Sequence, residues 1–378
     1  MQTSPIERKM GGNVLSSRVR RVELADFRNY SRETVDLSEG FNVIAGPNAQ
    51  GKTNFLEALY LLATTRLLRG KKDAEAIREG AEKATVSAIQ FETDTELGFF
   101  LERGVKKKAL LNGLALPRAS DLIGRLRCVC VSAADMEIVR GDPSQRRLFL
   151  DLELSALSSA YLRHLTLYKR AMEQRNALLR DSRDRFHPPE AFEIWEDQIA
   201  QNGAEIRNAR RSFAEELTPF SKSVHREMGS GESLKLEYRI QDEALTYEAL
   251  LAGLAQNRSV DVARGSTSLG PHRDDLDIQV DGKEARLFGS QGQQRTAVIA
   301  LKMATLSLIR DREGIPPMLL LDDILSDLDE TRRAMLVEIV LSRAGQAVLT
   351  CTEASAAGKV ILSRAKLFEV LGGTIKEQ

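Results

Sequence analysis

The segment 46–53 constrains this chain more than any other part of its sequence. It reads Gly-Pro-Asn-Ala-Gln-Gly-Lys-Thr and fits the pattern G-x-x-x-x-G-K-[ST]. The apolar residues 41–45 before it predict a buried strand, and the leucine spacing in 54–62 predicts a helix. A strand, a glycine-containing loop and a helix in this order predict a phosphate-binding loop, because the loop N–H groups and the helix N-terminus then face the anion.

Each residue type in this loop has an expected role. Gly46 and Gly51 let the backbone wrap a phosphate. Lys52 is expected to reach the β- and γ-phosphates of ATP, and Thr53 to hold Mg²⁺ through its hydroxyl. The alternative, a glycine turn with a merely solvated lysine, does not account for the flanking strand and helix. The expected ATP-binding residues are Gly46, Pro47, Asn48, Ala49, Gln50, Gly51, Lys52, Thr53 and Asn54.

A second segment supplies what a phosphate-binding loop needs for chemistry. Residues 318–321 are apolar and are followed by Asp322 and Asp323, as in a Walker B strand. Asp322 is expected to lie beside the Mg²⁺ held by Thr53, and Asp323 to orient or deprotonate an attacking water. Asp323 and Lys52 are therefore the candidate catalytic residues.

Composition excludes several other classes of protein. The 378 residues carry 54 basic and 54 acidic side chains, so no global field attracts nucleic acid, and binding to DNA requires local patches. The scarcity of aromatic residues, at 5%, argues against a base-stacking platform. Three scattered cysteines predict neither a disulfide framework nor a zinc site. The absence of a long apolar run predicts no membrane span and a cytoplasmic location.

The pattern of apolar residues predicts the layout of the remaining chain. Residues 84–113 alternate between apolar and polar and predict antiparallel hairpins. Residues 151–182 and 192–217 have helical spacing and are separated by His187-Pro188-Pro189. They predict a hairpin of two helices of about thirty residues, each about 45 Å long. We therefore expect a flexible tail over 1–18, a head formed by 19–150 and 262–378, and a helical arm over 151–261.

The stretch 288–296 resembles the signature loop of ABC-type ATPases. It places Ser290, Gly292 and Gln293 at a helix N-terminus, about thirty residues before the Walker B segment. In that family the loop caps the γ-phosphate bound by the partner subunit, so that ATP joins two heads. The residues that match the signature loop are Ser290, Gln291, Gly292 and Gln293. The family's D-loop lies at the same dimer interface, and the residues that match it are Ser326, Asp327 and Asp329.

Within that superfamily the chain resembles the RecF family most. The resemblance rests on motifs spread over nearly the whole chain. These are the phosphate-binding loop with Asn54, residues 26–30 (Asp-Phe-Arg-Asn-Tyr), 146–151 (Arg-Arg-Leu-Phe-Leu-Asp), 270–275 (Gly-Pro-His-Arg-Asp-Asp), 289–296 and 319–329. The resemblance implies an α/β ABC-type ATPase head with an inserted helical arm.

The resemblance also implies a function in recombinational repair and fork maintenance. The protein is expected to form an ATP-dependent homodimer on DNA. It would act with RecO- and RecR-like proteins to direct recombinase loading at gaps, in an SOS-linked and nucleoid-associated role. ATP and Mg²⁺ are the implied cofactors, and a slow ATPase used as a switch is the implied activity. Candidate DNA contacts come from two local basic patches: Arg66, Arg69, Lys71, Lys72, Lys106, Lys107 and Lys108.

Three departures from the family pattern affect the expected hydrolysis of ATP. Residues 132–135 replace the usual proline and glutamate of the loop that precedes the arm. Asp323 is shorter than the glutamate of general ABC heads, which predicts slow hydrolysis. The switch histidine is absent, and Thr352 is at best a weak substitute for it.

Two alternative functions fit part of the sequence. An ATP-binding scaffold without useful turnover agrees with the missing histidine. A P-loop phosphotransferase explains the loop at 46–53 but not the stretch 289–296, and it predicts a monomer. A nuclease-bearing relative of these heads would need an added catalytic domain. His272 is expected to fix the Gly270-Pro271 turn, and the adjacent carboxylates of Asp274 and Asp275 to point in opposite directions and hold no metal.

Overall fold

The structure, a computed structural model, describes residues 17–378 except 71, 230 and 243, and of Asp327 it describes the backbone alone. Most of the predicted tail, residues 1–16, lies outside the described residues. The chain forms two compact units, the first ending at Ala133 and resuming over Ile309–Gln378, the second spanning Ala134–Leu308. The predicted head and arm divide the chain at other positions, after 150 and after 261. These domain boundaries stay a prediction.

The first unit contains a six-stranded sheet built around the strand that precedes the phosphate-binding loop. The strand order is β15-β14-β3-β13-β12-β8, and all neighbouring strands are parallel except β14 and β15. The central strands are short apolar runs with nearly every residue buried, as expected in a sheet covered on both faces. Their bounds are β3 (Phe41–Ala45), β8 (Cys128–Val131), β12 (Met318–Asp322), β13 (Ala347–Cys351), β14 (Ala365–Leu371) and β15 (Thr374–Glu377).

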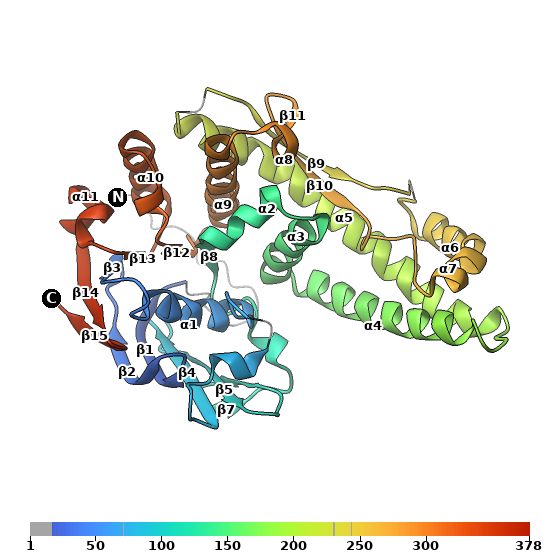
Figure 1. Cartoon of the computed structure of the whole chain (residues 1–378), viewed down its shortest axis with the longest axis horizontal. Helices are drawn as coiled ribbons and strands as arrows, with labels where there is room; N and C mark the ends of the chain where they lie inside the picture. The colour runs from blue at the N-terminus through green and yellow to red at the C-terminus, as the bar shows by residue number, and fades with distance from the viewer. Residues whose placement is uncertain (1–16, 71, 230, 243) are drawn as a thin grey trace, which may run out of the picture. The chain divides into compact units, whose positions relative to one another are not determined.

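A second, antiparallel sheet of the first unit has the order β2-β1-β4-β5-β6-β7. Helix α1 (Lys52–Thr64) contacts strands of both sheets, and its buried leucines join them into one apolar core (Figure 1). The predicted hairpins over 84–113 are confirmed, with a turn at Asn112-Gly113 where both residues have positive φ. The strands are β1 (Val19–Phe27), β2 (Tyr30–Asp36), β4 (Lys83–Gln90), β5 (Glu96–Glu102), β6 (Lys108–Leu111) and β7 (Leu114–Ala115).

Short helices complete the first unit. The longest, α10 (Glu330–Arg343), lies between β12 and β13 in the chain and is capped by Asp329, whose carboxylate accepts from the N–H of Arg332. The other helical elements are η1 (Asp73–Ala76), η2 (Ala119–Leu122), η4 (Leu325–Asp327), η5 (Ala354–Ala357) and α11 (Lys359–Leu362).

The second unit is mainly helical and contains a small antiparallel sheet of order β11-β10-β9. Its helices include the long hairpin of α4 and α5, which run side by side (Figure 1). The predicted hairpin is thus present, but its helices differ in length, with 23 residues in α4 and 38 in α5. The elements are η3 (Ala133–Met136), which begins in the first unit, α2 (Glu137–Arg140), α3 (Pro143–Leu157), α4 (Ser159–Asp181), α5 (Glu190–Glu227), β9 (Leu234–Arg239), α6 (Tyr247–Gln256), α7 (Arg258–Arg264), β10 (Asp275–Val280), β11 (Lys283–Glu284), α8 (Ala285–Phe288) and α9 (Gln291–Glu313), which ends in the first.

The predicted single helix over 151–182 is wrong, because it is two helices that meet at Ser158. Ser158 has an extended backbone and its hydroxyl accepts from the N–H of Tyr161. Serine is a favoured N-cap because its side chain satisfies an N–H group that has no partner within the helix. The apolar spacing continues through the break, so periodicity alone does not reveal it.

Buried arginines tie the helices of the second unit together. Arg175 on α4 is fully buried, and its guanidinium bonds to Glu196 at 3.0 Å and Asp261 at 2.7 Å. Arg207 on α5 is also fully buried and makes two hydrogen bonds to Asp274, each of 2.8 Å. Fully buried charges of this kind are tolerated only when paired and hydrogen-bonded. This unit therefore depends on a polar core as well as on apolar packing.

The segment 270–275 has a structural role, as predicted. The ring of His272 meets the hydroxyl of Tyr168 at 2.6 Å through Nδ1 and the carbonyl oxygen of Thr267 at 3.0 Å through Nε2. Asp274 bonds to Arg207, whereas the neighbouring Asp275 faces Arg146. The adjacent carboxylates thus point to different partners, as expected for an extended segment. Among the described residues no cluster of three or more potential ligands could hold a metal ion.

We expect His272 to make this unit less stable in mild acid. Burial lowers the pKa of His272 to about 4, from 6.5 for an exposed ring. The unfolded chain therefore takes up a proton that the folded chain does not, so stability is intact above pH 6.5 and falls as the pH decreases towards 4. The loss from this group is about 3 kcal/mol at most. Urea unfolding at pH 7 and pH 5 measures it, and His272→Gln should flatten the difference; an equal pH dependence in both proteins would contradict the assignment.

Candidate nucleotide-binding site

Two glycines of the phosphate-binding loop are required by its backbone and its neighbours. Gly46 and Gly51 have φ values of 153° and 121°, which other residues rarely adopt. A Cβ on Gly46 would lie 2.4 Å from the carbonyl oxygen of Val370, and one on Gly51 would lie 2.6 Å from the side-chain nitrogen of Asn29. The loop can therefore pass close to β14 and to the segment before β2 only with glycine at these positions.

Lys52 is the first residue of α1 and is buried. Its Nζ donates to the carbonyl oxygens of Gly46 at 2.7 Å and Pro47 at 2.9 Å, so the ammonium group lies within the curve of the loop. Asn48 and Ala49 form the exposed crest of this curve, and Ala49 has a left-handed φ of 64°. The arrangement concentrates one positive charge and the N–H groups of a helix N-terminus at a single point, which suits a phosphate.

The structure brings Thr53 and Asp322 together, although 269 positions separate them in the sequence. The hydroxyl of Thr53 donates to Oδ1 of Asp322 at 2.8 Å. Strand β13 lies between β3 and β12, and its Thr350 donates to the same carboxylate at 2.9 Å. A threonine hydroxyl beside one carboxylate is a donor set of hard oxygens, which suits Mg²⁺ completed by phosphates.

Asp323 is held differently from Asp322. It has a left-handed φ of 54°, and its N–H donates to the hydroxyl of Thr350 at 3.0 Å. Its carboxylate accepts a 2.6 Å hydrogen bond from Ser326, the first residue predicted for the D-loop. Burial and the nearby carboxylate of Asp323 raise the pKa of the Cys351 thiol to about 11. Thr352, in the place of a switch histidine, is exposed.

Residues 29 and 30 support the loop, a role that the sequence did not predict. The side chain of Asn29 donates to the carbonyl oxygen of Gln50 at 2.8 Å and accepts from Asn54 at 2.8 Å. The hydroxyl of Tyr30 donates to the carbonyl oxygen of Gly51 at 2.9 Å. The segment 26–30 was recognised only as a motif of the RecF family, and these contacts give a physical reason for it.

A buried carboxylate on α1 positions Arg69 at the same site. Glu57 is fully buried, accepts two hydrogen bonds from Arg28 at 2.7 and 3.0 Å, and accepts from the N–H of Arg69 at 2.8 Å. The guanidinium of Arg69 lies 3.6 Å from Asp322 and 3.3 Å from the hydroxyl of Thr53. Arg69, predicted as a DNA contact, is therefore placed next to the candidate Mg²⁺ ligands.

The residues of the predicted signature loop form the N-terminus of α9. The N–H of Ser290 donates to Oε1 of Gln293 at 2.6 Å, and the N–H of Gln293 donates to the hydroxyl of Ser290 at 3.2 Å. This reciprocal pair is a capping box. Gln293 also donates to Glu232 at 2.6 Å. Ser290 and Gln291 are exposed and Gly292 is partly exposed, so this helix N-terminus is accessible.

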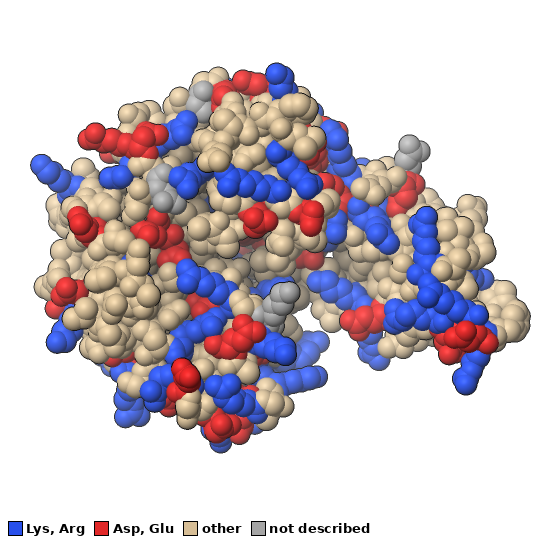
Figure 2. All heavy atoms as spheres, viewed as in Figure 1, with Lys and Arg blue, Asp and Glu red and all other residues tan. Residues whose placement is uncertain are grey.

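The two basic patches predicted for DNA lie close to each other. Nζ of Lys107 bonds to Asp73 at 2.7 Å, and Asp73 directly follows Lys72 in the chain. Lys107 is thereby largely covered, whereas Arg66, Lys72, Lys106 and Lys108 are exposed. Lys71 lies outside the described residues. On the face drawn in Figure 2, basic and acidic side chains are interspersed, in line with the zero net charge.

The chain is similar to known proteins over most of its length. The family model described as "RecF/RecN/SMC N terminal domain" matches residues 18–368. A protein of Agathobacter rectalis named DNA replication and repair protein RecF is 36% identical, over 95% of this chain and 98% of its own length. One of the same name from Symbiobacterium thermophilum is 40% identical, over 88% and 90%.

Solved structures match as well. A structure described as the recombination mediator protein RecF-ATP in the RecFOR pathway superposes with a TM-score of 0.87 at 29% identity, covering 98% of this chain and all of that one. An Smc head domain from Pyrococcus furiosus, with an extended coiled coil, matches with a TM-score of 0.55 at 16% identity and shows the fold alone.

The fold and the paired Thr53 and Asp322 define an ATPase head of the ABC and SMC class, which confirms the predicted α/β fold. Within this class the chain belongs to the RecF family of DNA replication and repair proteins. None of the described helices is long and apolar enough to span a membrane.

Proposed function

We propose that this protein is an ATP-gated DNA-binding protein of recombinational repair. The observation that supports the proposal most is the 2.8 Å hydrogen bond between Thr53 and Asp322, which joins the phosphate-binding loop to the end of β12. Lys52 would bind the β- and γ-phosphates, and Thr53 with Asp322 would hold Mg²⁺. When bound, Mg²⁺ would neutralise charge on the phosphates. A related RecF structure is described as an ATP complex, in agreement with this assignment.

The proposed gate is a homodimer in which each exposed α9 N-terminus caps ATP bound by the other copy. The capping box satisfies the N–H groups of Ser290 and Gln293, and the N–H groups of Gln291 and Gly292 between them would face the anion. Asp323 would orient the attacking water, and Ser326 holds its carboxylate. The short side chain of Asp323 and the exposed Thr352 in the place of a switch histidine support slow hydrolysis of ATP. ATP would then act as a switch.

The proposed DNA contacts are to the phosphate backbone, from Arg66, Lys72, Lys106 and Lys108, with Arg69, Lys71 and Lys107 as further candidates from the sequence. We also propose that it acts at gaps with RecO- and RecR-like partners. A similar structure is described as belonging to the RecFOR pathway, which supports such a partnership. The SOS link and a cytoplasmic, nucleoid-associated location stay predictions. An ATP-binding scaffold without turnover remains the second candidate, because Asp323 is the shorter acid and no histidine follows β13.

Replacing Ser290 with arginine tests the proposed gate. The longer, charged side chain would block the helix N-terminus without touching the phosphate-binding loop of its own chain. We expect ATP to bind each monomer as before, while the ATP-dependent dimer weakens by at least about tenfold, a cost of about 1.4 kcal/mol. Mass in solution with and without ATP, beside the affinity for ATP, measures both effects.

The control for this variant is Ser363→Arg, at an exposed position after α11. It should leave both measurements unchanged. Loss of ATP binding by the monomeric Ser290→Arg protein would refute the assignment of this loop to the partner's nucleotide. An ATP-dependent dimer of unchanged affinity would mean that the signature loop is not part of the dimer interface.

A further inference from the structure

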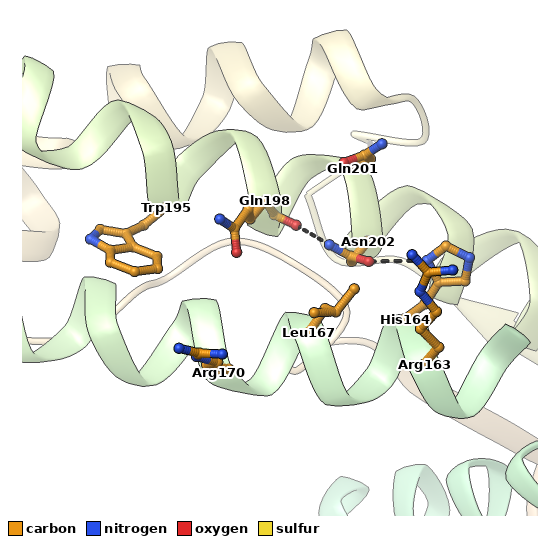
Figure 3. A pocket seen from close by; sticks show the side chains of 8 residues that line it. All are labelled: Arg163, His164, Leu167, Arg170, Trp195, Gln198, Gln201 and Asn202. Carbon is orange, nitrogen blue, oxygen red and sulfur yellow. Dashed lines mark hydrogen bonds between the residues drawn. The ribbon is translucent and has the colours of Figure 1, made fainter. Parts of the chain in front are cut away.

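The helical hairpin of the second unit carries a cavity far along the chain from the nucleotide-binding residues. It has a volume of about 530 Å³ and lies between α4 and α5. Figure 3 shows Trp195 and Arg170 at one end and Arg163, His164 and Asn202 at the other, with Leu167 and Gln198 between them. Trp195 is the single tryptophan of the chain. Nothing in the nucleotide site accounts for this cavity.

The charged groups that line the cavity are all potential cations. Arg163 and Arg170 are exposed, and among the described residues neither has a carboxylate partner. No aspartate or glutamate belongs to the lining. The nearby carboxylates of α5 are engaged elsewhere, since Glu196 pairs with buried Arg175 and Asp197 accepts from Tyr247. The charge of the cavity is therefore complementary to an anion.

The cavity also has an apolar component. Leu167 and Trp195 line the cavity, and Leu167 is 36% exposed. Both lie within helices and not in a loop, so their side chains are presented by regular backbone. Tryptophan and arginine are, with tyrosine, the residues enriched at sites that dominate protein–protein binding. An occupant should thus offer an apolar side chain as well as negative charge.

The polar groups of the cavity are ordered before any ligand binds. The buried Asn202 donates to the carbonyl oxygen of Gln198 at 2.7 Å, which directs its own carbonyl oxygen towards Nδ1 of His164 at 3.0 Å. Because this oxygen can only accept, Nδ1 of His164 donates, and Nε2 is left outside this pair. A site that is already ordered loses little entropy when it binds.

We propose that this cavity, lined by α4 and α5, binds an acidic peptide segment of a partner protein. Arg163 and Arg170 are seven residues apart, or about 10 Å along the helix. Three to four extended residues span that distance. The two guanidinium groups would bind carboxylates of the peptide, and Leu167 and Trp195 would contact an apolar side chain between them. A single-stranded nucleic acid fits less well, because such sites use several aromatic residues in succession and this cavity has one.

The fluorescence of Trp195 provides the test, since no other tryptophan contributes. The probe is a pool of acetylated hexapeptides of the form Glu-Glu-x-x-Glu-Glu, with leucine, isoleucine, phenylalanine or methionine at each x. We expect a saturable change in emission below about 1 mM peptide. A pool with lysine in place of glutamate should give none. Arg163→Glu and Arg170→Glu should each weaken binding at least about tenfold, as for a lost charge-assisted hydrogen bond.

The matched control is Arg211→Glu, which reverses an exposed charge elsewhere on α5. It should bind the peptide pool like the unaltered chain, and all variants should keep their affinity for ATP. No saturable change at about 1 mM, or binding unaffected by both charge reversals, would overturn the proposal. Equal or stronger binding of a twelve-residue oligothymidylate that the same reversals abolish would also overturn it, and would assign the cavity to nucleic acid.

Discussion

Replacing Lys52 with alanine is expected to abolish ATP binding and ATP-dependent dimerisation together. The ammonium group is the one side-chain cation inside the loop among the described residues, and it would bond to both the β- and γ-phosphates. Charge-assisted hydrogen bonds contribute about 1.5–3 kcal/mol each, so two of them correspond to roughly 100-fold or more in affinity. Nucleotide titration and mass in solution measure the two losses.

Lys222→Ala is the control, because Lys222 is an exposed lysine of α5 in the other unit. It should bind ATP and dimerise normally. A Lys52→Ala protein that still forms dimers in ATP would contradict the proposed gate, since dimerisation would then not depend on the nucleotide. If instead ATP affinity stays normal, the phosphate-binding assignment itself is wrong.

Replacing Arg175 with methionine is expected to destabilise the second unit by about 3–5 kcal/mol. Methionine fills much of the same volume but leaves Asp261 and part of Glu196 as buried negative charges without their partner. Urea unfolding followed by the fluorescence of Trp195 reports on this unit, because the tryptophan lies on α5.

Arg211→Met makes the same chemical change at an exposed position of α5 and should cost little. A loss below about 1 kcal/mol for Arg175→Met would mean that the buried charges are compensated in another way. Such a result would also weaken the view that a polar core holds α4, α5 and α7 in their arrangement.

The sequence predicted features whose physical cause is local. The hairpins over 84–113 are an example, because both residues of the Asn112-Gly113 turn have positive φ and the flanking residues pair. The strand at Met318–Asp322 is another, since an unbroken apolar run ending in acids has few other interpretations. In contrast, the break at Ser158 was missed because the apolar spacing on both sides of it continues in phase.

The sequence alone predicts the kind of chemistry, through the loop at 46–53 and the acids at 322 and 323, and it also identifies the family. Each of these predictions rests on a short segment whose residue types are needed to bind phosphate or Mg²⁺ or are typical of the family. The contacts between distant side chains, in contrast, follow from the way the strands and helices pack. Thr350 reaches Asp322 because β13 lies between β3 and β12, and Arg69 reaches it because buried Glu57 anchors its backbone. Such contacts depend on strand order and burial, which no short segment specifies.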